Sequence, residues 1–161
     1  MRLDALNAMD HEQAEEAFLR CCGSRAWAVA MTASRPFAGI DDVLDAGDRI
    51  WQRLGPAGWR EAFAAHPRIG ETARGWSEQE QSRVNRADDG VRARLAAANR
   101  EYEARFGQTF IICATGRTAD EILAVLERRL GNDPADELTI AADEQRRITR
   151  LRIARLLADD E

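Results

Sequence analysis

The sequence predicts an all-α fold, with all 161 residues in a single compact domain. Apolar residues recur at helical spacing along nearly the whole chain, and capping or helix-breaking residues stand where each helix is expected to begin or end. The β-like run Thr109 to Ala114 is too short and too isolated to form a sheet. No linker or repeat interrupts the chain, and its length allows one core without disulfides or a structural metal. We therefore expect one domain over residues 1–161.

Four helices are expected in the first part of the chain. Asp10 and Ser24 are typical N-cap residues for the first two. The second helix is expected to stop at Arg35-Pro36, and Gly55-Pro56 separates the third from the fourth, because a residue before proline is pushed out of the α region. The expected helices cover about residues 11–22, 25–34, 41–54 and 57–65.

The second part of the chain predicts further helices around two irregular segments. Residues 67–76 contain two glycines and no periodicity, which indicates a loop. Ser77 is expected to begin a polar helix, or a pair of helices, that ends at Phe106-Gly107. The run from Thr109 to Ala114 is then a buried extended segment or the start of a helix. Thr118 has capping-box spacing with Glu121, and Pro134 is expected to begin the last helix.

The charged residues exclude several classes of function. The formal net charge is -5, with acidic residues spread through the chain, which argues against nucleic acid and anionic membranes as partners. All 23 basic residues are arginine, so a lysine Schiff base, a lysine-bound pyridoxal cofactor and a Walker-type phosphate loop are excluded. The planar, permanently charged guanidinium suits carboxylates, so this composition fits an anionic small-molecule substrate.

The cysteines and histidines give no sign of a disulfide framework or a metal site. Cys21, Cys22 and Cys113 are odd in number and two are adjacent, which favours a reducing compartment. The two histidines have no zinc-ligand spacing. No apolar run is long enough to span a bilayer, and no targeting signal is recognised. We therefore expect a cytoplasmic protein with no metal and no membrane partner.

His66 stands directly before Pro67, where the backbone leaves the α region. We expect its side chain at or just past a helix end, from which it can project into a cleft. The alternative is that Trp59, Phe63 and His66 form one half-buried stripe in which the imidazole bonds to a backbone carbonyl. This segment alone favours the alternative, and the residues that follow reverse that preference.

Ser77 and Glu80 have two compatible interpretations. Serine with glutamate three residues later is the capping-box signature. A helix N-terminus also offers free backbone N–H groups and the positive end of a dipole to an anion, with Glu80 and Gln81 beside it. The spacing alone is weak evidence for a site.

Arg152 shares one helical stripe with Ile148 and Leu156. An arginine in such a stripe extends to the surface, pairs with a carboxylate or binds a ligand, and the sequence leaves these alternatives open. Cys113 is expected to be a core residue and not a nucleophile. His11 is expected to be exposed. The arginines around Arg152 are expected to be solvated: Arg146, Arg147 and Arg150.

Four motif blocks occur in order along nearly the whole chain. They are Trp59-x-x-x-Phe63-x-x-His66-Pro67-Arg68-Ile69-Gly70, Ser77-x-x-Glu80-Gln81, Phe106-Gly107-x-x-Phe110-Ile111 with Gly116-Arg117-Thr118, and Ile148-Thr149-x-Leu151-Arg152. With them the sequence resembles the 2-oxo-4-hydroxy-4-carboxy-5-ureidoimidazoline (OHCU) decarboxylase family of urate degradation. The first two blocks are the specific part of this resemblance, and the others support it.

The resemblance implies about eight helices and conversion of the ureidoimidazoline substrate to (S)-allantoin with loss of carbon dioxide and no cofactor. It implies that His66 is the catalytic acid/base, that Glu80 is its partner, and that Arg152 meets the substrate near its carboxylate. The implied substrate-binding residues are Pro67, Ser77, Gln81, Phe110, Ile111, Ile112, Cys113 and Ala114.

Two other functions stay open on the residues alone. A hydrolase or isomerase acting on a related ureide ring would use the same histidine and glutamate, and a hydrolase would release no carbon dioxide. A helical interaction domain, with its tryptophans partly at an interface, needs no pocket at all. The tryptophans are Trp27, Trp51, Trp59 and Trp76. An apolar stripe on the helices around residues 91–102 is also a candidate homodimer surface.

Overall fold

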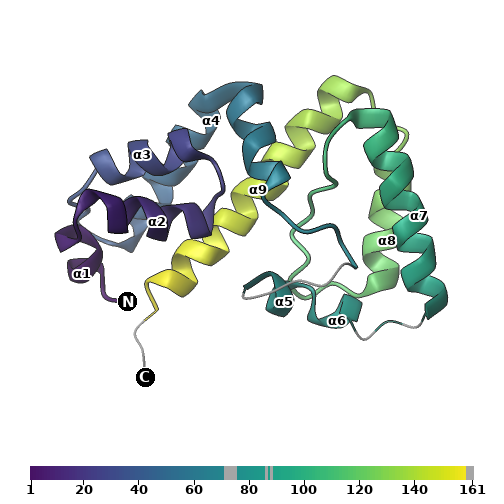
Figure 1. Ribbon diagram of the computed structural model, residues 1–161, viewed down its shortest axis with the longest axis horizontal. Coiled ribbons are helices and arrows are strands. Elements are labelled where there is room, and N and C mark those ends of the chain that lie inside the picture. Colours follow the sequence, from purple (N-terminus) through teal and green to yellow (C-terminus); the bar gives the residue numbers. More distant parts are fainter. Residues whose placement is uncertain (71–75, 86, 88, 159–161) are drawn as a thin grey trace. The chain divides into compact units, whose positions relative to one another are not determined.

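The computed structural model describes residues 1–70, 76–85, 87 and 89–158. Every regular element in these ranges is an α-helix (Figure 1), so the all-α prediction is confirmed. The helices are α1 (Leu3–Ala8), α2 (His11–Cys21), α3 (Arg25–Ala33), α4 (Ile40–Ala64), α5 (Trp76–Glu80), α6 (Ser82–Asn85), α7 (Asp89–Phe106), α8 (Ala119–Arg129) and α9 (Pro134–Leu156). No helix in the described ranges is long and apolar enough to cross a membrane.

The chain divides into two compact units, and each is described by itself. Unit 1 comprises Met1–Ala62 and Gln145–Glu161, and unit 2 comprises Phe63–Glu144. In Figure 1 the first unit holds the purple and blue helices with the yellow end of α9, and the second holds the green helices. The single domain over residues 1–161 stays a prediction.

The helix ends of unit 1 follow the predicted signals. The Asp10 carboxylate accepts a hydrogen bond from the Gln13 amide at 2.8 Å, and the Ser24 hydroxyl accepts one from the Trp27 amide at 3.3 Å. The third and fourth predicted helices form one element, α4, with a single non-helical residue at Gly55 (φ 72°), directly before Pro56. The sequence pattern missed α1, whose six residues are too few to show a helical period.

The core of unit 1 is built around Trp27, which is completely buried. Its indole N–H donates to the Gly47 carbonyl at 3.0 Å, and its ring meets Phe18 edge-on with 5.9 Å between centroids. A Cβ at Gly47 would lie 3.4 Å from the indole, so glycine allows this close approach. Trp51 is also buried, so the alternative that places the tryptophans partly at an interface does not hold for these two.

The core of unit 2 is formed by α7, α8 and the extended segment that joins them. Leu95, Ala98 and Tyr102 of α7 are buried in it, and Val91 packs against it half-buried. The apolar stripe around residues 91–102 was expected to be an exposed homodimer surface, and that prediction is wrong, because the stripe faces its own core. The homodimer is left as a prediction without a surface to support it.

Two helix starts of unit 2, at Thr118 and at Pro134, follow the predictions. The Thr118 hydroxyl accepts from the Glu121 amide at 3.2 Å and the Glu121 carboxylate accepts from the Thr118 amide at 3.5 Å, so the predicted capping box is confirmed. Pro134 begins α9 as expected. Ser77 is the second residue of the described part of α5 (Trp76–Glu80), and the residues before Trp76 lie outside the described ranges, so the capping box predicted for Ser77 and Glu80 stays a prediction. The loop predicted before it lies outside the described residues from position 71 to position 75.

Candidate active site

The segment from His66 to Gly70 leaves the end of α4, as the sequence predicts. The His66 amide donates to the Phe63 carbonyl at 3.2 Å and closes the last turn, after which Pro67 continues in non-helical backbone. His66 and Pro67 are both half-buried. The half-buried imidazole fits both the predicted position past the helix end and the alternative of a half-buried stripe with Trp59, and its role as acid/base stays a prediction.

This segment is anchored to the rest of unit 2 at three consecutive residues. Arg68 forms a bidentate ion pair with Glu103 of α7, at 2.6 and 3.2 Å. The side chain of Ile69 is buried in the unit 2 core. The Gly70 amide donates to Oε1 of Gln81 at 3.0 Å, so the segment that carries His66 is tied directly to the residue after Glu80.

The short helix α5 places the second predicted motif beside the first. Ser77 and Glu80 are half-buried, and Gln81, the residue after α5, is 4 % exposed. The backbone N–H of Gln81 donates to the Ser77 carbonyl at 3.1 Å and continues the hydrogen bonding of the helix. In the described ranges the Gln81 side chain makes one hydrogen bond, in which Oε1 accepts from the Gly70 backbone. The predicted contact with a substrate would then be made by the side-chain nitrogen, Nε2.

The extended segment after α7 is the third part of the site. Phe110, Ile111, Ile112 and Ala114 are buried, while Cys113 is half-buried. Burial raises the pKa of the Cys113 thiol, and the carboxylates of Glu144 and Glu80 raise it further. This thiol therefore stays protonated at neutral pH, in agreement with the prediction that it is no nucleophile. Glu80 of α5 is thus one of the charged groups that act on this thiol.

A turn at the end of the extended segment connects it to α6. The Arg117 amide donates to the Ala114 carbonyl at 3.0 Å, and Gly116 takes a positive φ of 79° in this turn. Arg83 of α6 donates to the Gly116 carbonyl at 3.0 Å. Within unit 2, the described contacts thus bring together three predicted pieces: the segment after His66, the helix that carries Glu80, and the segment up to Ala114.

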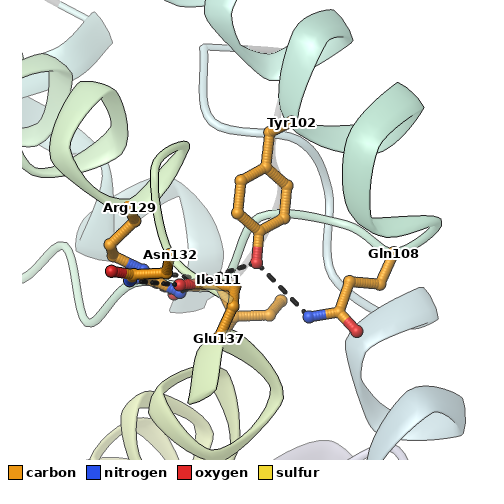
Figure 2. A network of polar contacts seen from close by, with 6 residues as sticks. All are labelled: Tyr102, Gln108, Ile111, Arg129, Asn132 and Glu137. Atoms are coloured by element: carbon orange, nitrogen blue, oxygen red, sulfur yellow. Dashed lines mark hydrogen bonds and ion pairs between the residues drawn. The ribbon is translucent and has the colours of Figure 1, made fainter. Parts of the chain in front are cut away.

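A buried ion pair holds the backbone of the extended segment in place. Figure 2 shows Arg129 of α8 and Glu137 of α9 paired through two guanidinium nitrogens, at 2.8 and 2.5 Å. Arg129 also donates to the Ile111 carbonyl at 2.8 Å, and its guanidinium lies 4.5 Å from the centre of the Phe110 ring. The Tyr102 hydroxyl donates to Glu137 at 2.6 Å. The carboxylate thus receives bonds from a cation and a phenol, which a buried charge requires.

Arg152 belongs to unit 1, where the structure confirms its predicted stripe. Ile148, Arg152 and Leu156 are all buried, and the guanidinium donates to the Arg20 carbonyl at 3.4 Å. Its charge lowers the pKa of the nearby thiols, but burial is the larger effect and raises the pKa of Cys21 to about 12. The catalytic role of Arg152 is a prediction that these contacts do not test.

Of the three arginines predicted to be solvated, Arg147 is exposed as expected, but Arg146 and Arg150 are less solvated. Arg150 donates to the Asp48 carboxylate at 2.7 Å, and Arg146 lies 3.7 Å from the same carboxylate. Both side chains are about one third exposed, so the prediction that they are simply solvated is wrong. The sequence gives no hint of this pairing, because Asp48 is distant along the chain.

Asn99 is a site-supporting residue that the sequence pattern missed. Its amide nitrogen donates to the Ile69 carbonyl at 3.2 Å, and the residue is only 2 % exposed. A polar residue inside the apolar stripe of α7, between Leu95 and Tyr102, was the available signal. Among the described residues no group of three or more His, Cys, Asp or Glu side chains is placed to hold a metal ion.

Unit 2 therefore defines an all-α protein whose candidate acid/base histidine and glutamate are carried by two segments that a hydrogen bond connects. Residues 7–154 match the family described as OHCU decarboxylase. The chain belongs to the OHCU decarboxylase family.

Individual relatives and solved structures agree with this assignment. The chain is 32% identical over 165 residues to the 2-oxo-4-hydroxy-4-carboxy-5-ureidoimidazoline decarboxylase of Amia calva, covering 95% of this chain and 93% of that protein. It is 38% identical to the uric acid degradation bifunctional protein TTL of Arabidopsis thaliana over 94% of its length, and spans 49% of that longer protein. A crystal structure of OHCU decarboxylase in the presence of (S)-allantoin matches with a TM-score of 0.83 and 38% identity, covering 90% of this chain and 99% of that one.

Proposed function

We propose that this protein is a carboxy-lyase that converts OHCU to (S)-allantoin in urate catabolism, without a cofactor. The observation that carries the proposal is that a single family match, over residues 7–154, includes His66, Glu80 and Arg152 together. The assembly of the segment after His66, α5 and the extended segment in unit 2 supports the proposal, because these parts are joined by described contacts.

The chemistry needs only what such a site offers. The bond from the ring carbon to its carboxylate breaks, carbon dioxide leaves, and the electron pair moves into the neighbouring C=N or C=O unit of the substrate. The hydroxyl on that carbon then loses its proton and becomes a C=O, and a proton is delivered to one face of the neighbouring, ureido-bearing carbon. The substrate supplies its own electron sink, so the protein has to orient the carboxylate, stabilise the developing charge and transfer the proton.

Each site residue takes a role that its position allows. His66, half-buried at the end of α4, delivers the proton, because an imidazole titrates near neutral pH. Glu80 orients the imidazole or raises its pKa. Arg152 binds the carboxylate of the substrate, for which a guanidinium is suited.

The extended segment supplies backbone groups to the substrate ring. The Ile111 carbonyl is already bonded to Arg129 and the Ala114 carbonyl to the Arg117 amide. Ile112 is 3 % exposed, and its N–H and C=O have no hydrogen-bond partner in the described part of the chain. Because buried backbone groups are nearly always bonded, these two are the groups we assign to the ring and ureido amides. Pro67, Ser77, Phe110 and Cys113 would line the pocket.

The test is to generate OHCU in situ from urate with the two upstream activities and to follow its decay by circular dichroism. We expect fast formation of optically active allantoin. His66→Ala should slow turnover by about 10²- to 10⁴-fold, the usual contribution of general acid–base catalysis. The matched control is His11→Ala, because His11 is the other histidine of the chain and is exposed.

Two outcomes would contradict the proposal. Decay at the spontaneous rate to racemic product, from a folded wild-type sample, would favour the interaction domain. Consumption of a ureide ring without release of carbon dioxide would favour the hydrolase or isomerase. Near-full turnover by His66→Ala and Glu80→Ala would reject the assignment of the acid/base pair alone.

The proposal also covers the organisation of the chain and its compartment. We infer one functional domain over residues 1–161, since the single family match crosses both units. We further propose a cytoplasmic location, supported by Cys21, Cys22 and Cys113 all being free thiols.

A further inference from the structure

The peptide unit between Ile69 and Gly70 is held on both sides by side-chain amides. The Asn99 amide nitrogen donates to the Ile69 carbonyl at 3.2 Å, and Oε1 of Gln81 accepts from the Gly70 N–H at 3.0 Å. These C=O and N–H groups belong to one planar peptide unit, so two bonds from separate segments fix both its position and its orientation. Asn99 and Gln81 are 2 % and 4 % exposed, which keeps water from competing for the bonds.

Packing among the described residues does not by itself fix this peptide unit. A cavity of about 370 Å³ lies against it, lined by residues 68–70 and by α7 residues that include Ala96 and Asn99. In the described part of the chain, a Cβ added at Gly70 would meet nothing within 4 Å, and Gly70 has a positive φ of 90°. The side chain of Ile69 is anchored in the core, but the peptide that follows it has free space beside it. The two amide bonds therefore decide where the backbone lies.

The held peptide connects the two residues proposed for catalysis. It follows His66 by three residues, with the rigid Pro67 between them. Gln81 directly follows Glu80, so the bond from Gly70 to Gln81 links the segment that carries the histidine to the segment that carries the glutamate. A shift of this link would change the distance between imidazole and carboxylate, and misplacement by about 1 Å can cost about 10²-fold in rate.

We propose that Asn99 and Gln81 are positioning residues that fix His66 against Glu80 by holding the Ile69–Gly70 peptide. The inference rests on the proposed function, adds Asn99 to the site, and gives Oε1 of Gln81 a backbone-holding role beside the substrate contact predicted for its amide nitrogen. The geometry requires a hydrogen-bond donor at position 99 and an acceptor at position 81. Substitutions that remove the donor or the acceptor therefore test the two bonds separately.

The kinetic test uses variants of similar volume. Asn99→Leu removes the donor and Gln81→Met removes the acceptor, while Gln81→Glu keeps an acceptor oxygen. We expect Asn99→Leu and Gln81→Met to lower kcat by about 10- to 100-fold. KM should stay within about threefold of wild type in Asn99→Leu, since Asn99 has no predicted substrate contact. Gln81→Glu should recover at least part of the lost kcat. The double variant should lose about as much as the worse single variant, because both bonds act on one peptide unit.

The matched control is Asn7→Leu in unit 1. Asn7 also holds backbone with both ends of its amide, donating to the Phe37 carbonyl and accepting from the Phe37 N–H, each at 2.9 Å. Its removal should lower thermal stability without changing kcat or KM of the folded protein. If Asn99→Leu does not fold, Gln81→Met and Gln81→Glu carry the test. A raised KM with normal kcat, or unchanged kinetics, in folded variants would overturn the inference.

A second measurement separates this inference from the proposed function. Hydrogen exchange of the Gly70 amide, followed by NMR in folded protein, should be at least about tenfold faster in Gln81→Met than in wild type or Asn7→Leu. If exchange is faster in Gln81→Met but the protein has no decarboxylase activity, the proposed function and the catalytic role of these bonds are rejected. The conclusion that Gln81 holds the Ile69–Gly70 peptide is then still confirmed. Unchanged exchange in an active enzyme would reject the hold and leave the proposed function standing.

Discussion

The two units use buried polar side chains in different ways. In unit 1 the fully buried examples bond to helical backbone: Ser24 caps α3, Thr32 donates to the Ala28 carbonyl at 2.8 Å, and Trp27 donates to Gly47. The half-buried Asn7 is the exception there, because it bonds to the irregular backbone of Phe37. In unit 2 buried polar side chains bond to backbone that belongs to no helix, as Asn99 does at Ile69 and Arg129 does at Ile111. Helical backbone satisfies its own hydrogen bonds, whereas irregular buried backbone needs partners from elsewhere.

This difference explains why unit 2 carries most of the predicted site. Its two irregular segments, 66–70 and 107–117, have backbone groups that are not used in intrahelical hydrogen bonds and can therefore bind other groups. Such segments need buried polar residues to bond their backbone, and the Arg129–Glu137 ion pair provides the strongest of these contacts. Unit 1 has an ion pair of the other kind, between Asp48 and Arg150, where both side chains are one quarter to one third exposed.

The largest expected effect comes from breaking the buried pair. Glu137→Leu would leave the guanidinium of Arg129 buried without a counter-charge, and the Tyr102 hydroxyl without its acceptor. Removing one partner of such a pair typically costs about 3–5 kcal/mol. Asp48→Asn in unit 1 should cost no more than about 1 kcal/mol, since its pair is partly solvated. Urea unfolding followed by far-UV circular dichroism measures both, and equal losses would contradict the comparison.

A second expected effect is a loss of stability at high pH that comes mainly from the buried thiols of unit 1. Burial raises the pKa of Cys21 to about 12 and that of Cys22 to about 11, from an ordinary 9.0. In the unfolded chain these thiols lose their protons near pH 9, but the folded protein retains them. The folded state then binds more protons, so stability falls as pH rises from about 9 towards 11 and 12, and is unaffected below pH 9.

Because one pKa unit corresponds to about 1.4 kcal/mol, shifts of about three units at Cys21 and two at Cys22 give losses on the order of 4 and 3 kcal/mol once both titrations are complete. In Cys21→Ala/Cys22→Ala the slope of unfolding free energy against pH between 9 and 11 should be shallower than in wild type. Cys113→Ala, a change of one half-buried thiol in unit 2, should alter the slope less. An unchanged slope in the double variant would show that the unit 1 thiols do not titrate on unfolding.

The sequence predicts the local features of both units and misses the long-range ones. The caps at Asp10, Ser24 and Thr118 were predictable, because capping depends on residues within one helical turn. The contacts of Asn99 with Ile69 and of Arg129 with Glu137 were not, because they join separate elements.

Errors in the predictions have the same origin. The stripe of α7 is apolar in sequence, and its pattern alone does not say whether it faces a core or a partner. Only the packing of the extended segment and α8 against Leu95 and Tyr102 decides that. The predicted capping box at Ser77 stays a prediction, because the residues just before the described part of α5 lie outside the described ranges.

The smallest expected effect concerns helix caps, for which we expect no difference between the two units. Helix caps are local, so they should contribute equally in the two units, whatever the units bury. Asp10 caps α2 in unit 1 and Thr118 caps α8 in unit 2, each through one bond from a backbone amide to its side chain. Asp10→Ala and Thr118→Ala should each lower the unfolding free energy by about 1 kcal/mol, and the glycine variants by only a few tenths, since glycine is itself tolerated at N-caps. Thermal and urea unfolding of these four variants provide the measurement. A loss at Thr118 several times that at Asp10 would mean that the capping box, through Glu121, also supports the turn around Gly116, and that unit 2 depends on polar contacts even at its helix ends.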